Sequence, residues 1–305
     1  STFAQSGREP LELLRQSGFF FSINQTGQRL SREQLLDLAK DAEGIVAGLE
    51  PYDAVVLDQL TSLRCISRCG VGLDNIDLDK ARQKGIAVLN TPDVVIQPVA
   101  ELAIAMMLDL LKKLTLQTQV LRTGQWKKSV GHLLAGRRVG ILGLGRIGKR
   151  TAEMLMAWGV EVWGSDLAPD QTWAREKGVK ITGTEELLRS CDIISIHLNV
   201  VPGSPFCLAE KEIQMMKPGA MLVNVSRGNF VDESSVCAAL KSGHLAGAAF
   251  DVFSEEPYRG PLCDFDQMVL TPHVATLTEE SRREMEWQAT KNLIDFFKGS
   301  LRDNA

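Results

Sequence analysis

The stretch "GRRVGILGLGRIGKRTAEMLMAWGVEVWGSD" (residues 136–166) decides the fold. Gly143, Gly145 and Gly148 form the pattern G-x-G-x-x-G between an apolar strand and a helix. A second strand then ends at Asp166, 18 residues after Gly148. This order of strand, glycine turn, helix and acidic strand end is typical of the first βαβ unit of a dinucleotide-binding sheet.

Each part of the pattern has a physical reason. The first glycine permits the tight turn, the second leaves room for a pyrophosphate, and the third lets the helix pack closely on the sheet. The free N–H groups at the helix start suit phosphate, and an acidic strand end suits the ribose hydroxyls of NAD while repelling the 2′-phosphate of NADP. A structural glycine turn and a methyltransferase that binds S-adenosylmethionine remain alternatives. The expected cofactor contacts here are Gly143, Gly145, Arg146, Ile147, Gly148 and Asp166.

Composition narrows the class of protein. The 305 residues suggest two domains, and 44% hydrophobic with 24% charged residues is normal for a globular protein. The net charge of -4 argues against nucleic acid as a partner. No apolar run approaches the ~18 residues of a membrane span, and the chain opens without a signal peptide. Six cysteines without a C-x-x-C pair and four dispersed histidines predict reduced thiols, a cytoplasmic location and no metal site.

Helices and strands alternate twice along the chain, which predicts two parallel sheets covered by helices. In the first series, "FFFSIN" (19–24) is predicted to be a strand, and a further strand is expected upstream of the helix "PLELLRQSG". Residues 99–124 are predicted to form one long, unusually apolar helix. We expect this helix to contact a second subunit, or alternatively to be buried between two domains of one chain. A capping box of Thr276 and Glu279 is predicted to begin the final helix.

Three chemically suggestive residues follow strands of the second series. Arg227 follows "MLVNVS", Glu256 follows "AAFDVF", and His273 follows "MVLTP". Ligands of open α/β sheets bind beyond the carboxyl ends of the strands. Alone, Arg227 could pair with a surface carboxylate, Glu256 could be a solvated loop residue, and His273 could bond to backbone. Together, beside a nicotinamide site, they predict hydride and proton transfer.

The chain resembles the D-isomer-specific 2-hydroxyacid dehydrogenases, and within them the D-3-phosphoglycerate-dehydrogenase-like branch. The resemblance implies an α/β fold of two doubly wound Rossmann-like lobes, a flavodoxin-like substrate lobe and an NAD-binding Rossmann lobe, with a cleft between them. It implies a substrate lobe of residues 1–94 and 275–305 and an NAD-binding lobe of residues 95–274. The motifs that carry it are "RCGVGLDNIDL" (68–78), "GILGLGRIGKR" (140–150), "MLVNVSRGNFVDESSVCAAL" (221–240), "AAFDVFSEEP" (248–257) and "LTPHVA" (270–275).

The resemblance also implies roles for individual residues. Arg227 would hold the substrate carboxylate and carbonyl, Glu256 would pair with His273, and His273 would be the acid/base. The backbone amides of Val71 and Gly72 would receive the substrate carboxylate. His197 is expected to be a cofactor-side or structural residue rather than a catalyst, and Asp251 is expected to lie on the cofactor side. The implied reaction interconverts a small anionic 2-keto acid and a D-2-hydroxy acid with NAD, in a homodimer.

Some motifs of this chain differ from those of the D-3-phosphoglycerate-dehydrogenase-like branch, so the resemblance does not identify the substrate. Its phosphoglycerate enzymes carry an Arg-Ser pair where this chain has Ala47 and Gly48, so no phosphate-binding cation is supplied there. Arg68 could serve a second anionic group, so 3-phosphoglycerate stays possible. The usual H-x-P-L-T is replaced by "HLNVVPG" (197–203). A dehydrogenase of formate or phosphite and a non-catalytic NAD-sensing protein are the alternative functions.

Overall fold

The computed structural model describes residues 3–200 and 206–299, so part of the "HLNVVPG" segment and both ends of the chain lie outside the described residues. The chain divides into two compact units. Unit 1 consists of Ser1–Val95 and Thr276–Ala305, and unit 2 consists of Ile96–Ala275. Each unit contains one parallel sheet, as the alternation of helices and strands predicts.

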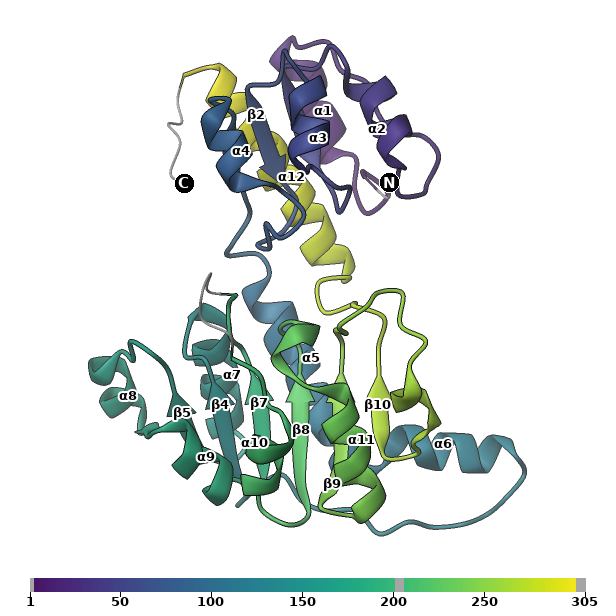
Figure 1. The fold of residues 1–305 in the computed structure, drawn as a ribbon, viewed down its shortest axis with the longest axis vertical. Coiled ribbons are helices and arrows are strands. Elements are labelled where there is room, and N and C mark those ends of the chain that lie inside the picture. Colours follow the sequence, from purple (N-terminus) through teal and green to yellow (C-terminus); the bar gives the residue numbers. More distant parts are fainter. Residues whose placement is uncertain (1–2, 201–205, 300–305) are drawn as a thin grey trace. The chain divides into compact units, whose positions relative to one another are not determined.

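Unit 2 is a seven-stranded parallel sheet in the order β10-β9-β8-β7-β4-β5-β6 (Figure 1). The chain moves outward from β4 through β5 to β6, returns to place β7 on the other side of β4, and continues outward. This reversal is the strand order of a dinucleotide-binding Rossmann sheet. The strands are β4 (Arg138–Leu142), β5 (Glu161–Ser165), β6 (Lys180–Ile181), β7 (Ile193–Ile196), β8 (Ala220–Asn224), β9 (Leu245–Phe250) and β10 (Met268–Leu270).

Helices cover both faces of this sheet. Helices α5 and α7 pack together on one face, while α9, α10 and α11 follow one another across the other (Figure 1). The helices are α5 (Ile96–Lys112), α6 (Leu114–Arg122), α7 (Arg146–Met156), α8 (Gln171–Lys177), α9 (Thr184–Ser190), α10 (Glu210–Met215) and α11 (Glu233–Ser242). Among the described residues, no helix is both long and apolar enough to cross a membrane.

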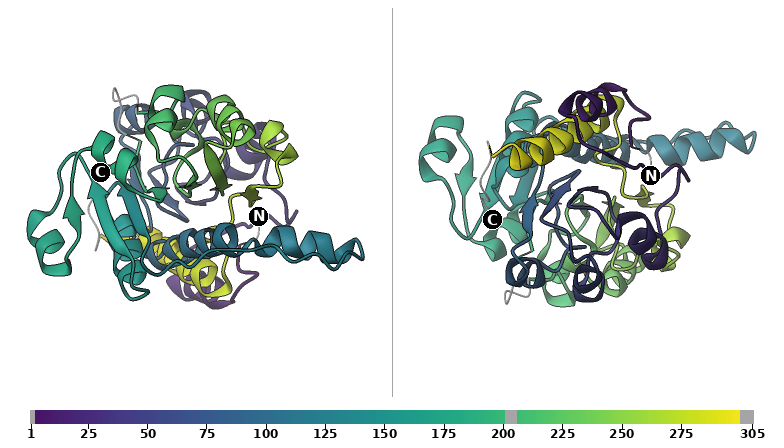
Figure 2. Two further views of the ribbon diagram at one scale, coloured as in Figure 1. Left: turned by 90° about the horizontal axis from the view of Figure 1, so that it is seen from below. Right: turned by 90° about the horizontal axis from the view of Figure 1, so that it is seen from above.

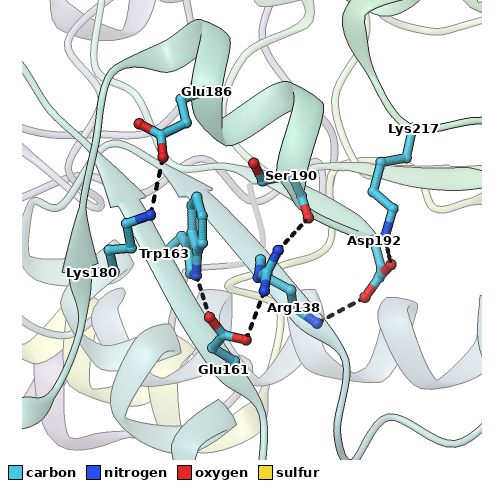
Figure 3. A network of polar contacts seen from close by, with 8 residues as sticks. All are labelled: Arg138, Glu161, Trp163, Lys180, Glu186, Ser190, Asp192 and Lys217. Atoms are coloured by element: carbon cyan, nitrogen blue, oxygen red, sulfur yellow. Dashed lines mark hydrogen bonds and ion pairs between the residues drawn. The ribbon is translucent and has the colours of Figure 1, made fainter.

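Hydrogen bonds between polar groups join β4, β5 and β7 at the edge of the sheet where these strands begin (Figure 3). The Arg138 guanidinium donates to Glu161 (3.2 Å) and to the Ser190 carbonyl (3.1 Å). The Arg138 guanidinium carbon lies 4.5 Å from the centre of the Trp163 ring. The Trp163 ring N–H donates to Glu161 (2.7 Å). The Arg138 backbone N–H donates to Asp192 (2.9 Å). We call this group the amino-edge network, because it lies where parallel strands start.

Unit 1 is smaller. Its sheet has the order β1-β2-β3, and α12 packs against all three strands and against α1 (Figure 1). The elements are α1 (Glu9–Ser17), α2 (Arg32–Ala39), β1 (Gly44–Ala47), α3 (Ala54–Gln59), β2 (Cys65–Arg68), α4 (Leu78–Gln83), β3 (Ala87–Leu89) and α12 (Glu279–Phe297).

The prediction of a strand at residues 19–24 is wrong. Three consecutive phenylalanines have high strand propensity, but this segment has no ladder partner in the described part of the chain, and the Phe20 side chain is fully exposed. A strand requires a neighbour to satisfy its backbone groups. The segment therefore stays irregular.

The prediction of one helix over residues 99–124 is also wrong. The helix breaks at Lys113, whose φ of 55° lies in the left-handed region. The Asp109 carboxylate accepts the Thr115 backbone N–H (2.9 Å) and thereby caps the new helix, α6. Nine residues of α5 are buried, whereas α6 buries none and extends away from the sheet of unit 2 (Figure 2).

The final helix begins two residues later than the predicted capping box implies. The N-cap is Thr278, whose hydroxyl accepts the Ser281 backbone N–H (3.2 Å). Thr276 does not have this role, because the chain is still outside the helix there. Spacing alone does not distinguish two threonines that lie two residues apart.

Candidate active site

The glycine turn joins β4 to α7 with little space to spare. Gly143 has a φ of 93°, and a Cβ there would lie 2.5 Å from the His197 carbonyl oxygen. A Cβ on Gly148 would lie 2.0 Å from the Gly143 carbonyl oxygen, so the helix can approach the strand only with glycine at this position. A Cβ on Gly145 would meet no heavy atom within 4 Å. Space therefore lies open beside Gly145, at the start of α7.

Asp166 lies beside this turn, directly after β5. One carboxylate oxygen accepts the Leu144 backbone N–H (2.7 Å), and the other accepts the Ala168 N–H (2.9 Å). The Gly145 N-cap makes no side-chain bond to the first turn of α7. Open space, a bare helix N-terminus and a fixed carboxylate at the next strand end fit the pyrophosphate and ribose of a dinucleotide.

His197 follows β7, and its backbone carbonyl lies against Gly143 of the glycine turn. Its side chain is buried, and burial lowers its pKa to about 4, so the ring is neutral at pH 7. Its Nε2 lies 2.9 Å from the Ser195 hydroxyl, and its backbone N–H donates to the Leu142 carbonyl (2.7 Å). A buried neutral ring that contacts the Ser195 hydroxyl suits a structural role rather than proton transfer.

Arg227 stands three residues after β8. The Asn224 amide donates to the Arg227 carbonyl (2.9 Å), and the guanidinium donates to the Ser226 carbonyl (2.8 Å). The following residue, Gly228, packs so closely that a Cβ would lie 1.8 Å from the Phe253 carbonyl carbon. The turn after β8 therefore packs directly against the segment after β9. This contact fixes the position of Arg227 at the end of β8.

Glu256 and His273 form a direct pair. The Glu256 carboxylate lies 2.9 Å from His273 Nδ1, and its other oxygen accepts the Phe253 backbone N–H (3.2 Å). The two side chains are 39% and 44% exposed, so a small molecule can reach the ring. β8, β9 and β10 are adjacent and parallel, so Arg227, Glu256 and His273 all lie at the carboxyl edge of this sheet.

Asp251 holds the His273 turn, a contribution that sequence reasoning missed. Its carboxylate accepts the Thr271 hydroxyl (2.6 Å) and the backbone N–H groups of Val274 (2.8 Å) and Ala275 (3.0 Å). Its carbonyl accepts the His273 N–H (2.8 Å). Asp251 is fully buried, which raises its pKa. A carboxylate within the apolar run "AAFDVF" was the available signal, because a buried charge needs several donors.

The strain at His273 explains why these bonds are needed. Its φ of 54° lies in the left-handed region, which is costly for a residue with a Cβ. Four hydrogen bonds from the segment 271–275 to Asp251 hold that conformation. Backbone strain maintained by surrounding bonds is common at catalytic positions.

Residues 104–275 match the family model for the NAD binding domain of D-isomer specific 2-hydroxyacid dehydrogenases. The chain belongs to this family. It is 36% identical to a glyoxylate reductase of Thermofilum pendens, over 89% of this chain and 83% of that protein. It is also 36% identical to a D-3-phosphoglycerate dehydrogenase of Rattus norvegicus, over 89% of this chain and 52% of that longer protein.

Solved structures agree with this assignment. The D-lactate dehydrogenase of Aquifex aeolicus, solved with NAD and lactic acid, superposes with a TM-score of 0.84 at 28% identity, over 96% of this chain and 92% of that one. The predicted family, Rossmann-like fold, NAD cofactor and dehydrogenase class are thus confirmed. The chain is an NAD-dependent 2-hydroxyacid dehydrogenase.

The loop at Val71 and Gly72 belongs to unit 1 and follows β2. Thr91 accepts the Gly70 N–H (2.8 Å), and Asn90 donates to the Val71 carbonyl (3.0 Å). Within the part of the chain that the structure describes, the amides of Val71 and Gly72 donate to no protein acceptor. Two adjacent N–H groups on a tethered loop are suitable donors for an anion.

Proposed function

We propose that this dehydrogenase reduces a small, unphosphorylated 2-keto acid of the size of glyoxylate or hydroxypyruvate to the D-2-hydroxy acid. The observation that carries the proposal is the Glu256–His273 pair, at 2.9 Å, on the same sheet edge as Arg227. An acid/base, its orienting carboxylate and a guanidinium are the groups that reduction of a 2-keto acid requires.

Glu256 determines which atom of His273 moves the proton. An ionised carboxylate only accepts hydrogen bonds, so Nδ1 carries a hydrogen directed at Glu256. Nε2 is then the nitrogen that gives its proton to the carbonyl oxygen during reduction and takes the hydroxyl proton during oxidation. Bound NADH would supply the hydride to the carbonyl carbon during reduction, and bound NAD⁺ would accept it from that carbon during oxidation. Its pyrophosphate would lie on the turn Gly143–Gly148 and its ribose hydroxyls on Asp166.

The substrate is held by its carboxylate. The planar guanidinium of Arg227 can reach the carboxylate and the carbonyl oxygen together. The amides of Val71 and Gly72 would donate to the carboxylate. For Asp251 we propose a positioning role in place of the expected cofactor contact, because both of its carboxylate oxygens already accept bonds from the segment 271–275.

Two observations favour an unphosphorylated substrate over 3-phosphoglycerate. Ala47 and Gly48 offer no cation. Arg68 is only 9% exposed, and its guanidinium passes within 2.6 Å of the position a Cβ on Gly70 would occupy. A buried guanidinium packed against its own strand end is poorly suited to a mobile phosphate.

The proposed homodimer forms through the arm of α6 and the segment that follows it (Figure 2). Exposed apolar side chains gather there, and an exposed apolar surface of this kind marks an interface. They are Leu114, Leu121, Trp126, Val130 and Leu133. Light scattering should give twice the chain mass, and Trp126→Asp with Val130→Asp should give the monomer.

The test of the proposed reaction is NADH consumption with a panel of 2-keto acids. We expect turnover with glyoxylate and hydroxypyruvate, and a kcat/KM at least ~10-fold lower with phosphohydroxypyruvate. Preference for the phosphorylated acid would overturn the substrate assignment. No turnover with any 2-keto acid, together with tight NADH binding, would favour an NAD-sensing protein. The free cysteines of the described chain and the use of NAD fit a cytoplasmic location.

A further inference from the structure

The loop that carries Glu256 follows β9 and lies at the surface. Residues 254–257 are exposed and form neither helix nor strand. Glu256 nevertheless has two fixed partners, because one carboxylate oxygen lies 2.9 Å from His273 Nδ1 and the other accepts the Phe253 backbone N–H (3.2 Å). A reactive side chain keeps its geometry only when further groups hold the residues that orient it. The pairing of Glu256 with His273 therefore depends on what holds this exposed loop.

Glu233 is the side chain that binds the beginning of the loop. It is the first residue of α11, which packs against β9 (Figure 1). One Glu233 carboxylate oxygen accepts both the Ser254 backbone N–H (2.9 Å) and the Ser254 hydroxyl (2.8 Å). In the described part of the chain, residues 254 and 255 make no other hydrogen bond. Glu233 is thus the polar anchor of the loop, attached two residues before Glu256.

Tyr258 fixes the other end of the loop. Its ring stacks on the Phe253 ring, with the ring centroids 4.2 Å apart and the planes 17° from parallel. Its hydroxyl accepts the Leu262 backbone N–H (3.2 Å). Burial and the charge of Glu233 raise the pKa of Tyr258 to about 12, so the hydroxyl keeps its proton and donates it to the Glu233 carboxylate in a hydrogen bond. Glu233 therefore binds the loop on both sides of Glu256.

We propose that Glu233 is a positioning residue for the Glu256–His273 pair, on which it acts through the loop of residues 253–258. The inference rests on the proposed function, because it requires Glu256 to orient an acid/base. Without the Glu233 carboxylate, Ser254 loses the acceptor of both its donors, and Glu256 spends less time in the orientation that meets His273 Nδ1. Within the described residues no hydrogen bond joins Glu233 to His273, so the effect on turnover passes through Glu256.

A purely structural role is the alternative, because an acidic side chain in the first turn of a helix is favourable in itself. A structural role predicts that removal of the Glu233 carboxylate has the same effect whether or not Glu256 is intact. The positioning role predicts that its effect on turnover disappears once Glu256 is changed, because two residues that act through one contact are not additive. The two roles therefore differ in a double-mutant cycle.

The experiment is a cycle of Glu233→Ala and Glu256→Gln, measured with NADH and the 2-keto acid that the chain reduces fastest. Glu233→Ala should lower kcat about 10-fold, with the Kd for NADH within about twofold of wild type. Glu256→Gln should lower kcat about 10²-fold. In the double variant, Glu233→Ala should lower kcat by less than about twofold beyond Glu256→Gln alone.

Two further variants control for the chemistry of the side chain. Glu233→Gln keeps an oxygen that can accept both Ser254 donors, so its kcat should stay within about threefold of wild type. Glu255→Ala removes an exposed negative charge from the same loop and should leave kcat unchanged. If Glu233→Ala does not fold, Ser254→Ala replaces it in the cycle, because this change removes one of the two hydrogen bonds.

An additive cycle, in which Glu233→Ala lowers kcat equally with and without Glu256, would overturn the positioning role. A wild-type kcat in Glu233→Ala beside a lowered kcat in Glu256→Gln would overturn it too. Both results would leave the proposed function intact. A wild-type kcat in Glu256→Gln would instead overturn the proposed function, and this inference with it.

Discussion

The two edges of the seven-stranded sheet in unit 2 are organised in opposite ways. At the amino edge, Arg138 and its partners join the beginnings of three strands in mutual hydrogen bonds, and Trp163 is buried beneath the guanidinium (Figure 3). At the carboxyl edge, His273 is strained and 44% exposed, with its ring directed at a single carboxylate. At the amino edge most polar groups bond to one another, although the buried Arg138 Nε has no hydrogen-bond partner among the described residues, whereas at the carboxyl edge the His273 ring is exposed enough to meet a ligand.

This difference predicts that substitutions at the two edges separate stability from turnover. Residues at the carboxyl edge hold reactive groups in conformations that folding alone does not favour. Residues at the amino edge touch no proposed ligand, so their contribution is to the folded state.

Arg227→Lys should produce the largest change in this series. Lysine keeps the positive charge but cannot bind carboxylate and carbonyl oxygens with one planar group. We expect kcat/KM for glyoxylate to fall by about 10³-fold, equivalent to about 4 kcal/mol of transition-state stabilisation, with Tm unchanged within ~1 °C. Steady-state kinetics and a thermal melt measure both. A wild-type kcat and KM would remove Arg227 from the substrate site.

Asp251→Asn should reduce turnover by about 10²-fold, equivalent to about 2.7 kcal/mol. The amide replaces one acceptor oxygen with a donor that opposes a backbone N–H or the Thr271 hydroxyl, so the His273 turn loosens. NADH affinity distinguishes positioning from cofactor contact. An unchanged Kd for NADH with lower kcat supports positioning, whereas a Kd weakened in proportion to kcat would return Asp251 to the cofactor side.

His197 should make the fold sensitive to mild acid. Its pKa is about 4 in the folded chain, below the ordinary histidine value of 6.5, so the unfolded chain takes the proton first. The part of the unfolding free energy that depends on a neutral His197 ring is fully present above pH 6.5. It is lost as the pH falls from 6.5 towards 4. Between pH 7 and pH 5 this amounts to about 2 kcal/mol.

Denaturant melts of the wild type and His197→Gln at both pH values measure that contribution. The variant should lose most of the pH dependence between pH 7 and pH 5. Equal pH dependence in both chains would show that His197 is not buried as a neutral ring.

Arg138→Met should have the smallest effect, and it should fall on stability alone. The substitution removes two hydrogen bonds and the cation–π contact of a side chain that is 35% exposed. We expect a loss of about 1–2 kcal/mol of unfolding free energy, with kcat within about twofold of wild type. A large loss of turnover without destabilisation would contradict the division between the two edges.

Much of unit 2 was predictable because its signals are local. The glycine turn, the strand that ends at Asp166 and the positions of Arg227, Glu256 and His273 after strands can be seen in short stretches of sequence. The break at Lys113, the irregular residues 19–24 and the bonds of Asp251 were not predictable in the same way. Each depends on a partner: Asp109 caps α6, a neighbouring strand is needed at 19–24, and the segment 271–275 surrounds Asp251.

The most direct test of the central claim is the turnover of His273→Asn, measured with glyoxylate and saturating NADH, beside its Kd for NADH from fluorescence titration. Asparagine is polar and tolerates the left-handed φ at this position, so the turn is retained while the proton donor is lost. We predict that kcat falls by about 10²–10⁴-fold while the Kd for NADH stays within about twofold of wild type. An unchanged kcat would contradict the assignment of His273 as the acid/base.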